Sequence, residues 1–133
     1  MDADFAFICD WADAGGKLHA LGIGIDTIFA PSMPVTHPTF HFVAQLHYSI
    51  VESGARDIEI RLMDRDGNDV VPAIRSRVNV PAPSYGFVEG THRVVVGFTN
   101  VTFPAYGSYA VHLSVDGEEM CSVALQLAPP PNT

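Results

Sequence analysis

Six histidines are the residues in this chain best suited to chemistry, because imidazole binds metals and transfers protons near neutral pH. His41 and His47 share one parity in an alternating stretch, which places them about 20 Å apart along a strand. The ligands of one zinc ion each lie about 2 Å from it, so these two side chains cannot share an ion. We therefore expect no His-bound metal and no other cofactor.

A cluster of carboxylates superficially resembles a calcium loop. Asp64, Asp66 and Asp69 lie close together in the sequence. An EF-hand loop counted from Asp64 requires glycine at its sixth position and glutamate at its twelfth, and the chain has Asp69 and Arg75 there. Because Asp66-Gly67 is a typical hairpin dipeptide, we interpret the cluster as a turn. Weak calcium binding stays open as the alternative.

The sequence contains no motif typical of a catalytic nucleophile or of a nucleotide-binding site. It contains no G-x-S-x-G elbow, and Gly22-Ile23-Gly24 lacks the third glycine of a dinucleotide-binding loop. Nothing near Cys9 in the sequence would activate its thiol. We interpret Cys9 and Cys121 as small, reduced, apolar residues, and we expect the protein not to be an enzyme.

Two groups of residues are candidates for binding. Tyr85 and Phe87 lie in a loop spanning residues 81–91, and loops seldom expose large aromatic side chains without a functional reason. They either contact a ligand or fold inward and close one end of a sandwich, and the inward arrangement is the commoner one. His41, Gln45 and His47 share a polar strand face that contacts a partner, responds to pH, or is simply hydrated.

The elements that position these residues are strands. Residues 40–48 alternate strictly between apolar and polar, residues 57–63 do the same, and Asp116-Gly117 closes a hairpin. We also read residues 104–107 as a hairpin turn, and residues 18–29 as one strand with a bend. The pattern predicts a single-domain, all-β, immunoglobulin-like antiparallel sandwich of about seven to nine strands. It covers residues 1–127, and residues 128–133 form a disordered, proline-rich tail.

The amino-acid composition indicates which classes of partner the protein has. The 133 residues include 7 basic and 15 acidic side chains, giving a net charge of −8 that would repel nucleic acid. No apolar run reaches the roughly 18 residues of a membrane span, and acidic residues near Met1 differ from a secretory signal. We expect a cytoplasmic protein. Charged residues are only 17% of the chain, which indicates either a protein partner or self-association, or else an unusually uncharged monomer.

Several short motifs together resemble a bacterial protein family known only as a domain of unknown function. The motifs occur in order along the chain: residues 4–10, Gly16-Lys17-Leu18, Leu21-Gly22-Ile23, residues 28–30, Phe103-Pro104, Gly107-x-Tyr109 and Val115-Asp116-Gly117. The resemblance extends from Asp4 to about Leu127. It implies a bacterial, cytosolic, stand-alone β-sandwich and assigns no substrate or site. Gly107-x-Tyr109 is also similar to immunoglobulin-type sandwiches, in which a tyrosine bonds a corner of the backbone.

These observations predict a non-enzymatic protein-binding or assembly module. A homodimer formed through an edge strand or a weakly charged sheet face is one form of it. The alternative is a sandwich that binds a small ligand or a carbohydrate with Tyr85 and Phe87 at one end.

Overall fold

A computed structural model describes residues 1–131 of the chain, which fold into strands and one short 3-10 turn. Within those residues ten strands form, rather than seven to nine, because the segment expected as one strand divides at Gly22 and Gly24 into β3 and β4. The elements are β1 (Asp2–Cys9), β2 (Trp11–Asp13), β3 (His19–Leu21), β4 (Thr27–Phe29), β5 (Val35–Ser49), η1 (Ile50–Glu52), β6 (Gly54–Asp64), β7 (Ile74–Val80), β8 (Glu89–Phe103), β9 (Gly107–Val115) and β10 (Glu118–Ala128).

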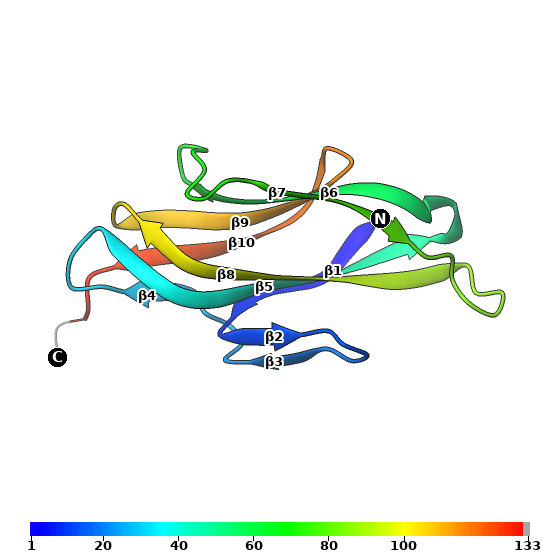
Figure 1. The fold of residues 1–133 in the computed structure, drawn as a ribbon, viewed down its shortest axis with the longest axis horizontal. Coiled ribbons are helices and arrows are strands. Elements are labelled where there is room, and N and C mark those ends of the chain that lie inside the picture. The colour runs from blue at the N-terminus through cyan, green and yellow to red at the C-terminus, as the bar shows by residue number, and fades with distance from the viewer. Residues whose placement is uncertain (132–133) are drawn as a thin grey trace.

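The strands form two facing layers and a small hairpin (Figure 1). One layer is a three-stranded sheet in the order β1-β5-β8, and the other is a five-stranded sheet in the order β4-β10-β9-β6-β7. All neighbours are antiparallel except β4, which pairs with β10 in parallel. The expected all-β sandwich is confirmed.

Alternating side chains of both sheets fill the space between the layers. On β5 the residues of one parity are all buried, from Phe40 to Tyr48, and Phe40 stacks on Phe98 of β8 with ring centroids 4.9 Å apart. The core contains residues of β5, β6, β8 and β9: Phe42, Leu46, Ile60, Phe98, Val111 and Leu113 are buried, and Val96 is partly buried. Burial of this kind stabilises the fold by roughly 25 cal/mol for each Å² of apolar surface.

The expected hairpin turn at residues 104–107 is instead a corner between the two sheets. β8 belongs to the three-stranded sheet, whereas β9 pairs with β10 and β6 in the other. The Tyr109 hydroxyl donates a hydrogen bond to the backbone oxygen of Ala105 at 2.6 Å. This confirms the backbone contact expected of Tyr109.

The two Asp-Gly turns differ from each other. Asp116 and Gly117 both have positive φ, at 50° and 84°, as a two-residue turn between Val115 and Glu118 requires. At the other turn the amide of Gly67 donates to Asp64 O at 3.1 Å, which makes a three-residue loop with Gly67 at a φ of 82°. The expected two-residue turn at Asp66-Gly67 is therefore wrong by one residue.

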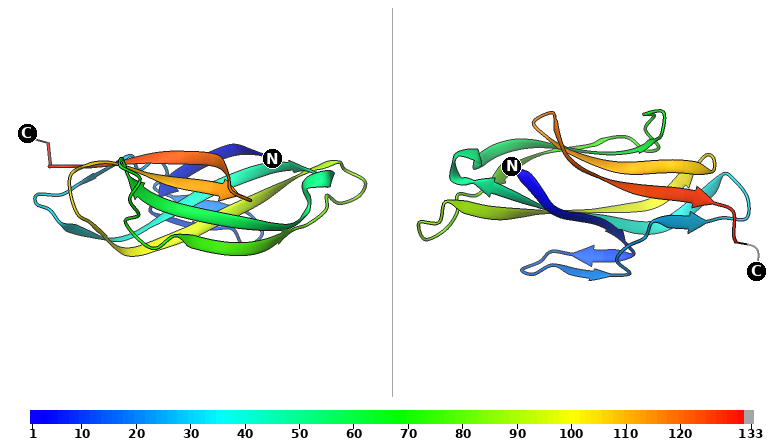
Figure 2. Two further views of the ribbon diagram at one scale, coloured as in Figure 1. Left: turned by 90° about the horizontal axis from the view of Figure 1, so that it is seen from above. Right: turned by 180° about the vertical axis from the view of Figure 1, so that it is seen from behind.

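Main-chain hydrogen bonds connect the two sheets along one side of the sandwich. The amides of Gly24 and Ile25 donate to Ile8 O in β1, and Asp26 O accepts from the amide of Gln126 in β10. A single segment therefore links both sheets on this side, which faces the viewer in the right panel of Figure 2. On the opposite side β7 and β8 are connected only through the loop at one end, residues 81–88.

The hairpin of β2 and β3 covers part of the outer face of the three-stranded sheet. Ala12 of β2 packs with Cys9 and Val43, which are both fully buried. Val43 belongs to the strand face expected to be polar and hydrated, so that expectation is wrong at this position.

The last strand extends one residue beyond the predicted end of the domain. β10 continues to Ala128, the first residue of the expected tail, and Asn132 and Thr133 lie outside the described residues. Within residues 1–131, no helix has the length and apolar character needed to cross a bilayer.

Candidate binding surface

A group of exposed apolar side chains occupies one end of the sandwich, and we call it the apolar end: Ile50, Val51, Tyr85, Phe87 and Val88. Tyr85 is 98% exposed, Val51 84% and Phe87 66%. Two segments supply these residues, the 3-10 turn after β5 and the loop before β8, which lie at the right in Figure 1. Large side chains this exposed and this close together are typical of contact surfaces.

Main-chain hydrogen bonds hold this surface in place. The amide of Ile50 donates to Val88 O at 2.8 Å and joins the two segments. Within the loop the amide of Phe87 donates to Ser84 O at 3.0 Å, and Tyr85 has a φ of 53°, a left-handed conformation that is uncommon for a bulky residue. Because local contacts fix this backbone, Tyr85 and Phe87 are presented to solvent in a defined geometry.

Tyr85 and Phe87 do not fold inward, because another residue already closes this end. Tyr48, the last inward-facing residue of β5, is buried, and its hydroxyl donates to Pro81 O at 2.6 Å. A Cβ atom added at Gly90, its partner on β8, would lie 2.9 Å from the Tyr48 hydroxyl. Tyr48 fills the space that the loop aromatics would otherwise occupy.

The polar face predicted on β5 forms a hydrogen-bonded row across its sheet. The Gln45 side chain donates to Asp4 Oδ2 in β1 at 3.0 Å and accepts from Arg93 Nε in β8 at 3.1 Å. Both ends of the Gln45 amide are therefore bonded, and this row links all three strands.

His47 and His41 lie on the same face but in different surroundings. His47 Nε2 lies 3.4 Å from Glu89 Oε1, and Nδ1 lies 4.0 Å from Asp4 Oδ1. His41 Nδ1 is 3.3 Å from Asp10 O. Glu89 directly follows Val88 in the chain, so the charged residues around His47 border the apolar end.

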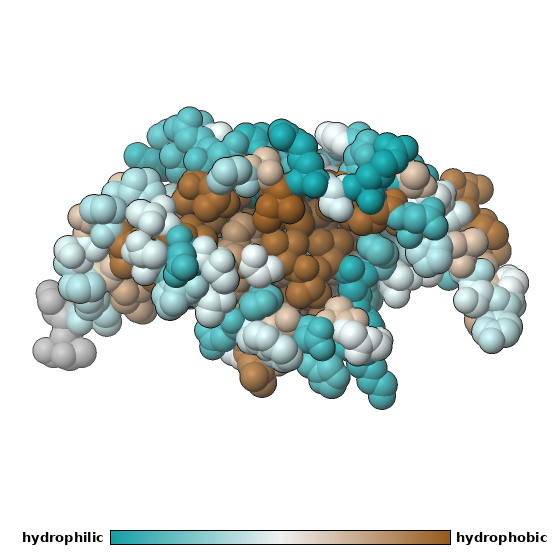
Figure 3. All heavy atoms as spheres, in the orientation of Figure 1, coloured by the Kyte–Doolittle hydropathy of each residue, from teal (hydrophilic) through white to brown (hydrophobic). Residues whose placement is uncertain are grey.

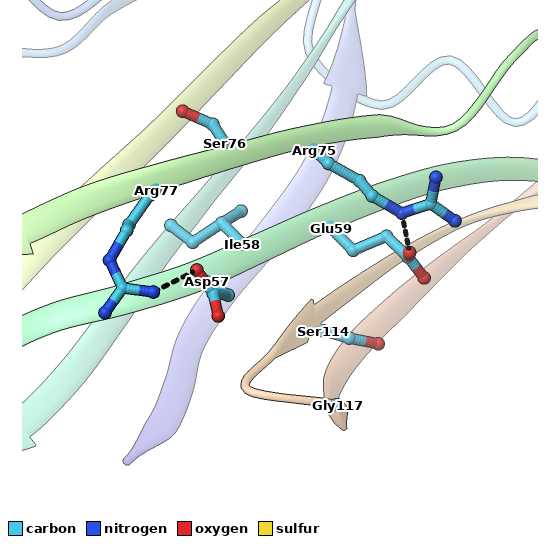
Figure 4. A pocket seen from close by; sticks show the side chains of 8 residues that line it. All are labelled: Asp57, Ile58, Glu59, Arg75, Ser76, Arg77, Ser114 and Gly117. Atoms are coloured by element: carbon cyan, nitrogen blue, oxygen red, sulfur yellow. Dashed lines mark hydrogen bonds and ion pairs between the residues drawn. The ribbon is translucent and has the colours of Figure 1, made fainter.

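The outer face of the five-stranded sheet carries a shallow depression of about 460 Å³ (Figure 4). Arg75 Nε donates to Glu59 Oε2 at 2.7 Å, and Arg77 Nη1 donates to Asp57 Oδ1 at 3.0 Å. The alternation of residues 57–63 puts both carboxylates on the outer face, but their partners on β7 depend on strand pairing, which alternation does not encode. Because Arg75 is 73% exposed, these are solvated surface pairs that contribute little to stability.

The carboxylates that resembled a calcium loop are engaged within the hairpin. Asp64 Oδ1 accepts hydrogen bonds from the amides of Asp66 and Asn68, both at 2.9 Å. The Asn68 amide, more than any other group, lowers the pKa of Asp64. Asp69 accepts two hydrogen bonds from Arg61, each at 3.0 Å, and Arg61 lowers its pKa. In residues 1–131 no group of three or more potential ligands is placed to hold a metal ion.

Comparison with protein-family models gives a match. Residues 4–128 fit the family described as a family of unknown function (DUF6941). No curated protein matches the chain.

Proposed function

The chain belongs to DUF6941, a family of unknown function, and we propose that it is a non-enzymatic module that binds another protein through the apolar end. The observation that carries this proposal is the exposure of Tyr85, at 98%, on a loop whose backbone is held by hydrogen bonds. Tyrosine and phenylalanine are enriched in protein interfaces, and a rigid loop loses little entropy on binding.

The distribution of charge supports a protein partner. No charged residue occurs in residues 78–88, although the whole chain has a net charge of −8. Interface centres are depleted of charge and are surrounded by polar rims. Glu89 and Asp4 supply such a rim on one side of the apolar end. The complementary partner has an apolar pocket bordered by basic side chains.

The alternative, a small ligand or carbohydrate, also depends on Tyr85, whose exposed ring offers a flat face for stacking. Ligand sites usually enclose most of the ligand surface. Tyr85 and Phe87 do not line any of five depressions on the surface of residues 1–131. A protein surface can be flat, so the geometry favours a protein partner.

A crosslinking experiment tests the proposal. A photoreactive phenylalanine analogue at Tyr85 is expected to crosslink a distinct protein in cells, and the purified partner is expected to bind the wild-type chain. The double variant Tyr85→Ala/Phe87→Ala should weaken that binding at least about tenfold, as loss of aromatic anchors does. The matched control is Trp11→Ala on β2, an exposed aromatic residue distant in sequence from the apolar end, which should bind normally.

Two results would overturn the proposal. One is unfolding of the double variant, which would make both aromatics core residues. The other is binding of a glycan by the wild-type chain that is lost in the double variant, without any protein partner.

We further propose a cytosolic setting, which is supported by the free thiols of Cys9 and Cys121.

A further inference from the structure

The two main sheets have four edges, and three of them are protected against pairing with another chain. β4 is only three residues long, and short edge strands offer little to pair with. β7 carries Arg75 and Arg77, and charged side chains oppose edge pairing. β1 carries Asp2 and Asp4, and its Ile8 O accepts hydrogen bonds from the segment that joins the two sheets.

The fourth edge, on β8, is less protected, because its charged residues, Glu89 and Arg93, both lie within its first five residues. β8 has 15 residues and pairs with β5 along one side only. Residues 94–103 contain neither a charge nor a proline. The strand is regular from Glu89 to Thr99. The regular part ends there because Asn100 has a φ of 50°. This regular edge is about 36 Å long at 3.3 Å per residue.

An apolar groove runs beside this edge. It has a volume of about 230 Å³ and lies between β7 and β8, on the side where the sheets are connected only through the loop at one end. Ile74 and Val78 of β7 and Val96 of β8 line it and are only partly buried. Figure 3 shows hydrophobic side chains gathered between the two layers on this side.

We propose that a second copy of this chain pairs with β8, antiparallel and edge to edge, in a twofold-symmetric dimer. The three strands of each copy then form one continuous sheet, and the groove of each copy faces that of the other. This arrangement satisfies the unpaired backbone groups of β8 and covers Ile74, Val78 and Val96 together.

The charges on β8 are compatible with a second copy. In registers centred on Val94, Val95 or Val96, Arg93 lies opposite Val95, Gly97 or Thr99 of the partner, respectively. Glu89 lies opposite Thr99 or residues further along the partner strand. Like charges directly opposite each other destabilise strand pairs, and none are opposed in these registers. β8 can therefore pair with a second copy of itself in these registers without placing like charges opposite each other.

Charge substitutions at two exposed threonines test the pairing. In all three registers, Thr91 of one copy lies directly or diagonally opposite Thr99 of the other, within reach of long side chains. Sedimentation velocity of the full chain up to about 100 µM should show a dimer. Thr91→Lys/Thr99→Lys and Thr91→Glu/Thr99→Glu should each raise the dimer dissociation constant about tenfold or more, and mixing them should restore dimers.

The control is Ser122→Lys, at an exposed position on β10, which should dimerise like the wild type. Hydrogen exchange of the wild-type chain adds a readout that needs no variant, since amides of β8 should gain protection as concentration rises. A monomer at about 100 µM would overturn the proposal, as would a dimer that neither charge pair weakens. Tyr85→Ala/Phe87→Ala should leave dimerisation unchanged, so failure of this inference is distinct from failure of the proposed function.

Discussion

The Tyr109 hydroxyl fixes the corner at which the chain crosses from one sheet to the other. Its ring is 5% exposed, and its hydrogen bond to Ala105 O is the contact that orders the corner. Tyr109→Phe should lower the free energy of unfolding by about 1 kcal/mol, because the Ala105 carbonyl loses its donor. Urea denaturation measures this change.

Tyr106 offers the matched control for that substitution. Its hydroxyl also donates to a backbone oxygen, that of Ala30, at 2.7 Å, but its side chain is 41% exposed. The Tyr109 hydroxyl also accepts a hydrogen bond from the amide of Ala105 at 3.4 Å, so Tyr109→Phe removes two hydrogen bonds and Tyr106→Phe should have the smaller effect. Equal losses from both variants would contradict a special role for Tyr109.

The two thiols should be poor nucleophiles in the folded protein. Burial raises the pKa of Cys9 and the pKa of Cys121, so the reactive thiolate is scarce. Iodoacetamide at about pH 7.5 should modify both slowly, and Cys121, which is only partly buried, should react before Cys9. Mass spectrometry of timed samples checks the order. In urea both should react fast, and rapid modification of native Cys9 would contradict the burial.

At the scale of elements, the hairpin of β9 and β10 depends on backbone conformation at its turn. Gly117 has a φ of 84°, which disfavours any side chain, so Gly117→Ala should lower the free energy of unfolding by about 1–2 kcal/mol. Gly15→Ala is the control, because Gly15 has no positive φ and its added Cβ would meet Asp13 Oδ2 at an ordinary 3.5 Å. Thermal denaturation of both variants makes the comparison, and equal effects would count against the turn geometry.

Local patterns predicted the strands well and their neighbours poorly. Alternation alone located β5 and β6, and it identified their buried residues correctly, including Phe42 and Ile60. Pairing partners depend on contacts between residues far apart in the sequence, which alternation does not encode. This is why the corner after Phe103 looked like a hairpin, and why Val43 looked exposed until β2 was found to cover it.

The candidate site was predicted only in part for the same reason. Tyr85 and Phe87 stood out because bulky aromatics are unusual in a loop, but their exposure depends on Tyr48, which closes the end from another strand. Ile50 and Val51 gave no local signal. The hydrogen bond from Ile50 to Val88 O places them beside the loop.

At the scale of the whole molecule, the two proposed surfaces are geometrically compatible. The apolar end includes the loop just before β8, whereas dimerisation uses the length of β8. Antiparallel pairing about a twofold axis places the two apolar ends at opposite ends of the dimer. A partner carrying two binding sites would then engage both ends, and its avidity would depend on whether its linker spans that distance.

Acid should destabilise the whole fold, because several carboxylates are held ionised by native contacts. The terminal ammonium of Met1 and the amide of Ser49 lower the pKa of Glu52 to about 2. The Asp57 amide and Arg56 lower the pKa of Asp116. The unfolded chain therefore binds protons at a higher pH than the native chain. Stability is fully present above the unfolded pKa values, roughly pH 4 to 4.5, and is lost as pH falls toward 2.

Urea denaturation at a series of pH values from about 7 to 2.5 measures this loss directly. The free energy of unfolding should change little from these carboxylates above about pH 5 and should decline steadily below it. Glu52→Gln cannot titrate, so its stability should be lower than that of the wild type at neutral pH and should fall less steeply in acid. Parallel curves for the two proteins would show that the contacts of Glu52 with Met1 and Ser49 do not favour its ionised form in solution.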